Sequence, residues 1–135
     1  MLTPINFMAI GIGAAAGAIC RWALGLWLNQ PGWHLPWGTL AANLIGGYFV
    51  GLLLGGLSMY PEAPIWLKLM LITGFLGGLT TFSTFSGEAV GLLERGAYLS
   101  AFGYIGFSLV GSLALTCLGF ATASLISTLS QAGSP

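Results

Sequence analysis

The residues most able to do chemistry are hydroxyl side chains that interrupt a long apolar stretch. Positions 74–86 read GFLGGLTTFSTFS, and five Ser or Thr residues fall within seven positions of that segment. Phe82 and Phe85 are three residues apart, so they share one face of a helix. The edge of an aromatic ring carries partial positive charge and can face an anion. In a membrane helix such a pair is usually apolar packing, but beside a polar strip it can also indicate an anion contact.

Further hydroxyl and amide groups extend this polar set. Ser83, Thr84 and Glu88 lie on neighbouring faces of the same segment, with Thr84 and Glu88 one helical turn apart. Asn43 is the one amide in the core of a predicted span, where an amide is as often an interhelical contact as a ligand contact. One hydroxyl normally bonds to its own helix, whereas several in register favour a lining. Such a stripe recurs every four residues near the end of the chain: Tyr104, Ser108, Ser112 and Thr116.

Carboxylates are missing from the centres of the apolar stretches, and Glu88, near one end, is the nearest. A metal-cation path would use carboxylates, and a proton-coupled carrier would have a titratable group at its site. The polar groups therefore favour passive movement of a small anion. Arg21 could draw anions to an entrance vestibule, or could extend to the lipid headgroups. Ser/His/Asp arrangements and metal-ligand clusters are missing from the sequence, so we expect no enzyme activity.

The composition places these residues in a membrane. The chain has 135 residues, of which three are basic and three acidic, so that 4% are charged and 56% are hydrophobic. A soluble domain carries about a quarter of its residues as charged side chains. This chain could not cover a water-facing surface. Its formal net charge of zero argues against a nucleic-acid partner.

Four stretches are long and apolar enough to cross a lipid bilayer as helices, which takes about 20 residues each. They run over about 5–28, 37–60, 65–93 and 98–129. The sequence therefore predicts an all-α integral membrane protein with one transmembrane domain over residues 1–135. Aromatic residues near the span ends form the expected interfacial belt: Trp22, Trp27, Trp33, Trp37, Tyr60, Trp66 and Tyr98.

The third span is predicted to break near its middle, at about residues 77–80. Gly77 and Gly78 weaken a helix, and the hydroxyl groups that follow compete for its carbonyls. Freed carbonyls are tolerated in hydrocarbon only where protein buries them or a wet cavity reaches them. Discontinuous helices in transporters use such carbonyls to bind cations. The alternative is an unbroken helix with a glycine-rich packing face.

Basic residues give the chain little orientation. An excess of Lys and Arg marks cytoplasmic loops, and here Lys68 lies near one side while Arg95 and Arg21 lie near the other. This near tie permits both orientations and hence an antiparallel pair. Since four thin spans enclose little of a pathway, we expect a homodimer. Glycines four residues apart let helices approach closely, although each set alone is more often generic packing: Gly13/Gly17, Gly47/Gly51/Gly55 and Gly87/Gly91.

Three segments resemble the small fluoride-exporting membrane proteins of microbes, the Fluc or CrcB family of fluoride channels. They are GAICRW at 17–22, GTLAANLIGGYF at 38–49 and, most specifically, GFLGGLTTFSTF at 74–85. The resemblance covers the whole chain. Leu76 and Leu79 replace a frequent Cys and Phe, and Ala42 replaces a frequent Val, all of them apolar changes.

The resemblance implies an antiparallel dual-topology homodimer with two pores, multi-pass in the bacterial inner membrane, through which fluoride leaves the cell. It also implies a structural sodium ion at the dimer centre, bound by the carbonyls of Gly77 and Thr80 from both subunits, and no organic cofactor. The fluoride path implied by the family consists of Asn43, Phe82 and Phe85, with Tyr104, Ser108 and Ser112 on the facing helix, and Ser83, Thr84 and Glu88 as a polar track.

Two other classes of protein remain as alternatives. A small multidrug-type, proton-coupled exporter also has four spans, but it needs a carboxylate in the first span, which has none here. A purely structural membrane subunit would have no use for polar groups in the middle of its spans. A passive fluoride channel is therefore the function that the sequence favours.

Overall fold

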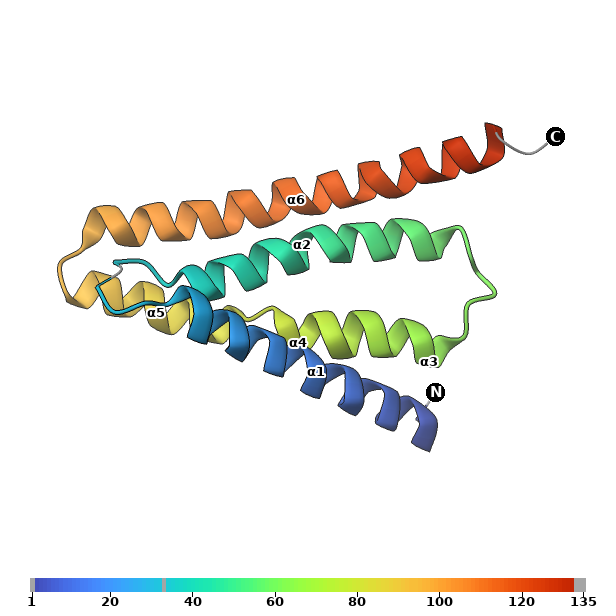
Figure 1. Cartoon of the computed structure of the whole chain (residues 1–135), viewed down its shortest axis with the longest axis horizontal. Coiled ribbons are helices and arrows are strands. Elements are labelled where there is room, and N and C mark those ends of the chain that lie inside the picture. The colour runs from blue at the N-terminus through green and yellow to red at the C-terminus, as the bar shows by residue number, and fades with distance from the viewer. Residues whose placement is uncertain (1, 33, 133–135) are drawn as a thin grey trace.

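The computed structural model describes residues 2–32 and 34–132, and the regular elements within them are all helical (Figure 1). In chain order they are α1 (Pro4–Leu28), α2 (Trp37–Ser58), α3 (Ile65–Lys68), the π-helical segment η1 (Leu69–Leu76), α4 (Gly77–Leu79), α5 (Phe82–Glu94) and α6 (Tyr98–Ala132). Trp33, one of the aromatic residues expected at the interface, lies outside the described residues. The predicted all-helical fold is confirmed.

Among the described residues, four units are long and apolar enough to cross a membrane, namely α1, α2, the run Ile65–Glu94 and α6. Their ends lie within three residues of the predicted ends. The run Ile65–Glu94, called the third span below, contains α3, η1, α4 and α5. Because successive spans alternate in direction, α1 begins and α6 ends at the same end of the bundle (Figure 1).

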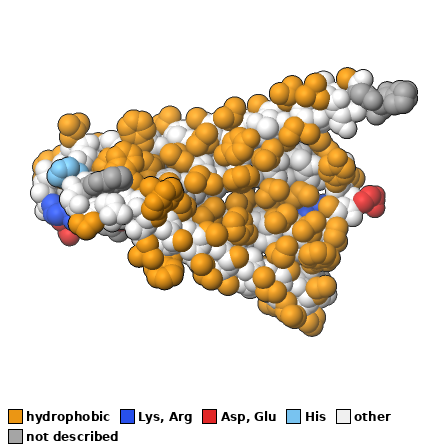
Figure 2. All heavy atoms as spheres, in the orientation of Figure 1, with side chains coloured by type: hydrophobic (Ala, Val, Ile, Leu, Met, Phe, Trp, Pro, Cys, Tyr) orange, Lys and Arg blue, Asp and Glu red, His pale blue; other side chains and the backbone are white. Residues whose placement is uncertain are grey.

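Large apolar side chains cover the outside of the helices. Leu99, Trp27 and Phe107 are 89%, 72% and 71% exposed. In Figure 2, hydrophobic side chains cover most of the visible face, and the charged side chains in view lie toward its two ends. Exposing this much apolar surface to water would be costly, at about 25 cal/mol per Å², whereas lipid tails are as apolar as the side chains themselves. The chain is a multi-pass membrane protein.

Glycines bring α2 close to α6, and α1 close to the third span. Gly51 of α2 faces the backbone of Thr116 in α6, and Gly13 of α1 faces the Met70 carbonyl of η1. A Cβ at either glycine would overlap with that backbone, so only glycine permits this approach. Two of the three predicted glycine sets therefore pack within one chain. At Gly87, in contrast, a Cβ would meet no atom of the described chain within 4 Å.

The third span is interrupted at two residues with extended backbone. Thr80 has φ −80° and ψ 153°, and Thr81 has φ −152° and ψ 122°. The helix passes through both glycines and ends at Leu79, and α5 begins at Phe82. The two extended residues lie at and just after the end of the range 77–80, where the sequence predicts a break.

A hydroxyl cap, rather than the glycine pair, sets the position of this interruption. Thr81 Oγ1 accepts a hydrogen bond from the amide of Thr84 at 3.2 Å and so caps α5, as Thr commonly does at a helix start. Gly78 has another role, because a Cβ at this position would overlap with the Ala14 carbonyl. It allows α4 to lie directly against α1.

Candidate ion site

An open-sided cavity of about 480 Å³ lies beside the interruption. Its lining comes from α2, from the third span and from α6, and it includes these residues of the predicted site: Asn43, Gly77, Thr80, Phe82, Phe85, Ser108 and Ser112. Groups that are far apart in the sequence thus meet on one cavity. The remaining lining is largely apolar or glycine.

Asn43 bonds to the interruption in both directions. Its Oδ1 accepts from the Thr81 amide at 2.8 Å, and its Nδ2 donates to the Thr81 carbonyl at 3.2 Å. The first of these bonds replaces the one that the Thr81 amide would make to Gly77 in a continuous helix, and the second adds a donor to the Thr81 carbonyl. Because an amide nitrogen has two hydrogens, one of them remains for a ligand in the cavity that Asn43 lines.

Phe82 and Phe85 are neighbours in different surroundings. Their ring centroids are 5.7 Å apart, and their planes are inclined at 46°. Phe85 is 7% exposed and packs on Tyr104, with ring centroids 5.3 Å apart. Phe82 is 74% exposed. Phe85 is therefore held firmly within one chain, whereas Phe82 presents its ring outward.

Ser108 supplies a hydroxyl that the chain leaves unused. The residue is 5% exposed, and its Oγ has no hydrogen-bond partner among the described residues. Buried polar groups are nearly always paired, so an unpaired hydroxyl on a cavity wall indicates a place for a ligand or water. Thr116, two turns further along α6, differs because its hydroxyl donates to the Gly47 carbonyl at 2.9 Å. The predicted hydroxyl stripe thus divides into two residues that line the cavity, Ser108 and Ser112, and two that bond to a neighbouring helix, Tyr104 and Thr116.

Behind Phe85, two hydroxyls bind the carboxylate of Glu88. The Tyr104 hydroxyl donates to Oε2 at 2.7 Å, and Thr39 Oγ1 donates to Oε1 at 2.8 Å. Glu88 also lines a second cavity of about 500 Å³, together with Arg95 and the loop after α1. Tyr104 and Glu88 do not line the first cavity. Phe85, which lines the first cavity, contacts Tyr104, and Tyr104 bonds to Glu88, which lines the second cavity.

Ser83 and Thr84 line neither of these two cavities. Thr81 Oγ1 lies 3.3 Å from Ser83 Oγ and donates to Thr84 Oγ1 at 3.1 Å. The strip of Ser83, Thr84 and Glu88 expected from the sequence is therefore two clusters, a hydroxyl cluster at the start of α5 and a carboxylate cluster one turn later.

Arg21 reaches the same hydroxyl cluster from α1. Its Nε donates to the Gly78 carbonyl at 3.1 Å, and its Nη1 donates to Thr84 Oγ1 at 3.5 Å. The sequence offered two positions for this guanidinium, an entrance vestibule or the lipid headgroups. The structure places it beside the interruption of the third span.

The interruption changes the partners of two main-chain carbonyls. In a continuous helix, Gly77 would accept from the Thr81 amide and Thr80 from the Thr84 amide. Those amides bond instead to Asn43 Oδ1 and to Thr81 Oγ1. Because Gly77 and Thr80 both line the first cavity, their carbonyl oxygens are suited to a cation of the kind that unwound transmembrane backbone binds.

The sequence did not select Thr39 and Thr81, which both take part in the site. Thr39 lies one helical turn before Asn43, and that spacing was the available signal for its place on the same side of α2. Thr81 stands in a pair with Thr80, and nothing in the sequence distinguishes which of the two hydroxyls caps the following helix.

Comparison with known proteins identifies the family. Residues 8–120 match the profile of a family described as "CrcB-like protein, Camphor Resistance (CrcB)". The chain belongs to the CrcB family. All three segments that carried the resemblance lie within the matched range, so that expectation is confirmed.

Several relatives of this CrcB-family chain carry the name "Fluoride-specific ion channel FluC". One from Bordetella petrii is 63% identical over 122 residues, which cover 90% of this chain and 94% of the relative. One from Bordetella avium is 62% identical over 126 residues, covering 93% and 98%. One from Albidiferax ferrireducens is 55% identical over 127 residues, covering 93% and 96%. With four membrane-spanning helices, this CrcB-family chain is a multi-pass protein of the inner membrane.

Proposed function

We propose that this chain forms a fluoride-specific ion channel, through which fluoride leaves the cytoplasm passively. The shared name of its relatives supports the choice of ion. The observation that carries the proposal is the first cavity, where the Phe pair and Asn43 meet the unpaired hydroxyl of Ser108. No carboxylate is among the described residues that line it. The family and the shared name of its relatives make this protein a channel and not an enzyme.

A fluoride ion that leaves water must replace the hydrogen bonds it loses. The first cavity offers neutral groups for this purpose, namely the Ser108 hydroxyl, the second amide hydrogen of Asn43 and the ring edges of Phe82 and Phe85. Binding must be favourable enough for the ion to enter and weak enough for it to leave. Weak donors in series meet both requirements, whereas a buried cation would bind the ion too tightly for rapid release.

The remaining residues of the proposed path continue from this cavity. Ser112 extends its wall along α6. Tyr104 and Glu88 lead from Phe85 to the second cavity, and the hydroxyls of Thr39 and Tyr104 offset the charge of the carboxylate. The hydroxyls of Ser83 and Thr84 add a polar track at the start of α5: Thr81, Ser83 and Thr84 together offer three hydroxyl groups there.

The channel is proposed to be an antiparallel, dual-topology homodimer. In one chain, the first cavity is open at its side and Phe82 is 74% exposed. Polar groups such as Asn43 would then face hydrocarbon, which membrane proteins avoid by burying them or by surrounding them with water. A second copy would close the cavity, and the near tie of basic residues permits it to insert in the opposite direction.

A sodium ion at the centre of this dimer is the second part of the assembly proposal. The carbonyls of Gly77 and Thr80 fit such an ion, because their usual amide donors are engaged elsewhere. A bound sodium would supply fixed positive charge between the two copies. This chain contributes the interruption that frees the carbonyls, and the side chain of Asn43 keeps it open.

Fluoride efflux from liposomes tests the function. The purified chain should release fluoride when a voltage is imposed without a pH gradient, because no Asp, Glu, His, Lys or Arg is among the described residues that line the first cavity. A proton-coupled exporter would instead follow the pH difference and ignore voltage. Efflux no faster than from protein-free liposomes would overturn the proposed function.

A further inference from the structure

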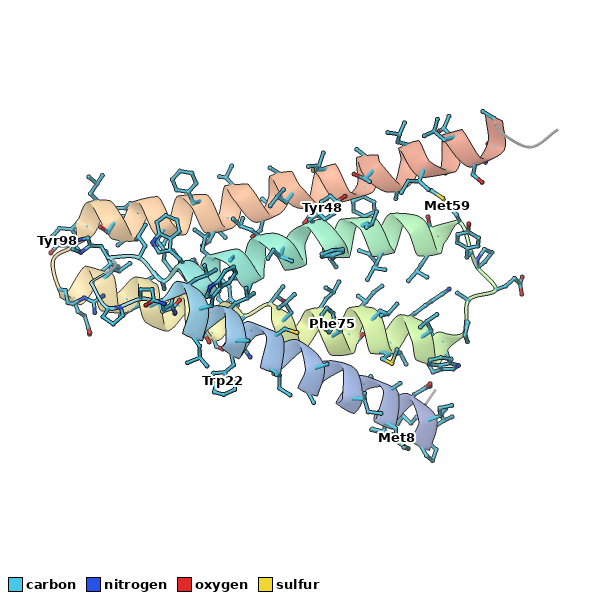
Figure 3. The ribbon with its side chains drawn as sticks, in the orientation of Figure 1. Met8, Trp22, Tyr48, Met59, Phe75 and Tyr98 are labelled. Atoms are coloured by element: carbon cyan, nitrogen blue, oxygen red, sulfur yellow. The ribbon has the colours of Figure 1, made fainter. Side chains whose placement is uncertain are left out.

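Arg21 is a cation placed well inside a membrane-spanning helix. It lies seven residues before α1 ends at Leu28, or about 10 Å along the helix axis. The neighbouring Trp22 projects away from the other helices in Figure 3, but the guanidinium bonds to the third span. An ionisable group at membrane depth is costly and is usually kept for function.

The guanidinium touches both sides of the interruption. Its Nε donates to the carbonyl of Gly78 in α4, and its Nη1 donates to the hydroxyl of Thr84 in α5. In a continuous helix the Gly78 carbonyl would accept from the Phe82 amide, but Phe82 begins a new helix here. The end of a helix carries partial negative charge, so a cation is a favourable partner for that carbonyl.

The close packing of α1 gives Arg21 this reach. Gly17, one turn earlier in α1, lies so near the third span that a Cβ there would overlap with the Phe75 carbonyl and lie 2.7 Å from the Leu79 amide. The Arg21 side chain therefore leaves α1 next to the last turn before the interruption. It needs no partner from outside the chain to make its two bonds.

We propose that Arg21 is a positioning residue that fixes the two halves of the third span relative to each other. Asn43 bonds to the extended segment between the halves, and Arg21 bonds to the helix on each side of it. The planar guanidinium can donate in two directions at once, whereas a lysine ammonium is a single point of charge on a flexible stem. The consequence for ion flux rests on the proposed fluoride function.

The experiment compares Arg21→Lys and Arg21→Gln with the parent chain in liposomes. Lys68→Gln is the matched control, because it also removes a cation that donates to a carbonyl, that of Pro61, away from the interruption. Fluoride efflux is measured per assembled protein at low and at high concentrations of an inert salt. We expect the fluoride flux of both Arg21 variants to be at least tenfold below that of the parent at both salt concentrations. The flux of the control should equal that of the parent.

An entrance charge would give a different result. If Arg21 only attracted anions, Arg21→Lys would conduct within twofold of the parent, and the defect of Arg21→Gln would shrink as salt screens the charge. That outcome would overturn the proposal.

A rescue experiment separates positioning from simple packing: methylguanidinium should raise the flux of Arg21→Gly several-fold, while methylammonium should not. Equal rescue by both cations, or rescue by neither, would also count against it.

Hydrogen exchange tests the positioning role without any transported ion. In detergent, Arg21→Lys should raise amide exchange at residues 79–84 at least tenfold relative to the parent, and should leave residues 40–55 unchanged. This result would stand even if the parent chain conducted no fluoride, in which case only the proposed function would fail. Unchanged exchange at 79–84 would refute the positioning role, whatever the flux.

Discussion

Side chains, rather than main-chain bonds, hold the interruption of the third span at the residue scale. Asn43 accepts a hydrogen bond from the main-chain amide of Thr81 and donates one to its carbonyl. The hydroxyl of Thr81 in turn caps α5. A hydrogen bond of this kind contributes about 1 kcal/mol when made, and a partner left unpaired and buried costs about 1–3 kcal/mol. The site therefore depends on a few specific atoms.

The two phenyl rings should respond differently to the same substitution. Ile keeps most of the bulk of Phe and removes the ring edge, so Phe82→Ile and Phe85→Ile should each lower fluoride flux about tenfold, as the loss of a contact of ~1.4 kcal/mol would. Only Phe85→Ile should also lower thermal stability, because Phe85 packs on buried Tyr104. Phe7→Ile, at an exposed position near the start of α1, is the control. Normal flux through both variants would mean that the rings serve only packing.

Asn43→Asp should abolish most of the flux while keeping part of the structure. The carboxylate can still accept from the Thr81 amide, but it cannot donate to the Thr81 carbonyl or to an anion, and it adds negative charge to the cavity. We expect the fluoride flux to fall about a hundredfold. The lost bond to the Thr81 carbonyl costs about 1–3 kcal/mol, and the new negative charge repels the anion as well. Efflux and thermal unfolding should be compared with Asn43→Leu, which loses both bonds to Thr81 and should be the less stable variant. Parent-like flux through Asn43→Asp would remove Asn43 from the path.

Residue types and spacing could select part of this site in advance. Asn43 was visible as an isolated amide in an apolar span, and Phe82 and Phe85 as a pair beside hydroxyls. The sequence could not show that Thr84 and Glu88 belong to different clusters, because a spacing of one helical turn places them on the same side of α5. Their partners, Arg21 and Tyr104, lie on different helices. Which hydroxyl of the α6 stripe stays unpaired also depends on the neighbouring helix.

At the scale of the elements, glycine decides which helices approach and where. The helix bounds were predictable because apolar length alone specifies a membrane span. The exact place of the interruption was not, since the glycine pair serves the contact between α4 and α1 and the hydroxyl cap of Thr81 sets the break. The wide π-helical turns of η1 (Leu69–Leu76) had no signal in the apolar pattern.

Gly17→Ala should separate α1 from the third span. The added Cβ would overlap with backbone atoms, which cannot rotate away as a side chain can. We expect a loss of stability of about 1–3 kcal/mol, as overpacking typically gives, measured as the midpoint of thermal unfolding in detergent. Gly11→Ala is the matched control in the same helix: nothing lies within 4 Å of its Cβ, and it should be neutral or stabilising by up to about 1 kcal/mol. Equal effects of the two changes would contradict the close contact.

The whole molecule is proposed to be complete only as an antiparallel pair, which topology can test. Because Cys20 and Cys117 are both exposed, they should first be replaced by Ser. A cysteine introduced by Glu94→Cys, at the exposed end of α5, should then react with an impermeant reagent in about half of the copies from one side of sealed vesicles. Labelling should become complete once the membrane is opened. Labelling of all copies, or of none, before opening would rule out dual topology.

The length of α6 has a consequence for the membrane around the protein. Its 35 residues extend about 52 Å, whereas the 22 residues of α2 extend about 33 Å, close to the ~30 Å of the hydrocarbon core. Tilting α6 alone cannot relieve this mismatch, because Gly51 fixes α2 closely against it. The last turns of α6 therefore reach past the lipid tails into the headgroup layer, where the hydroxyl of Thr128 would meet water. Bilayer thickness should thus act on this protein chiefly through the C-terminal turns of one helix.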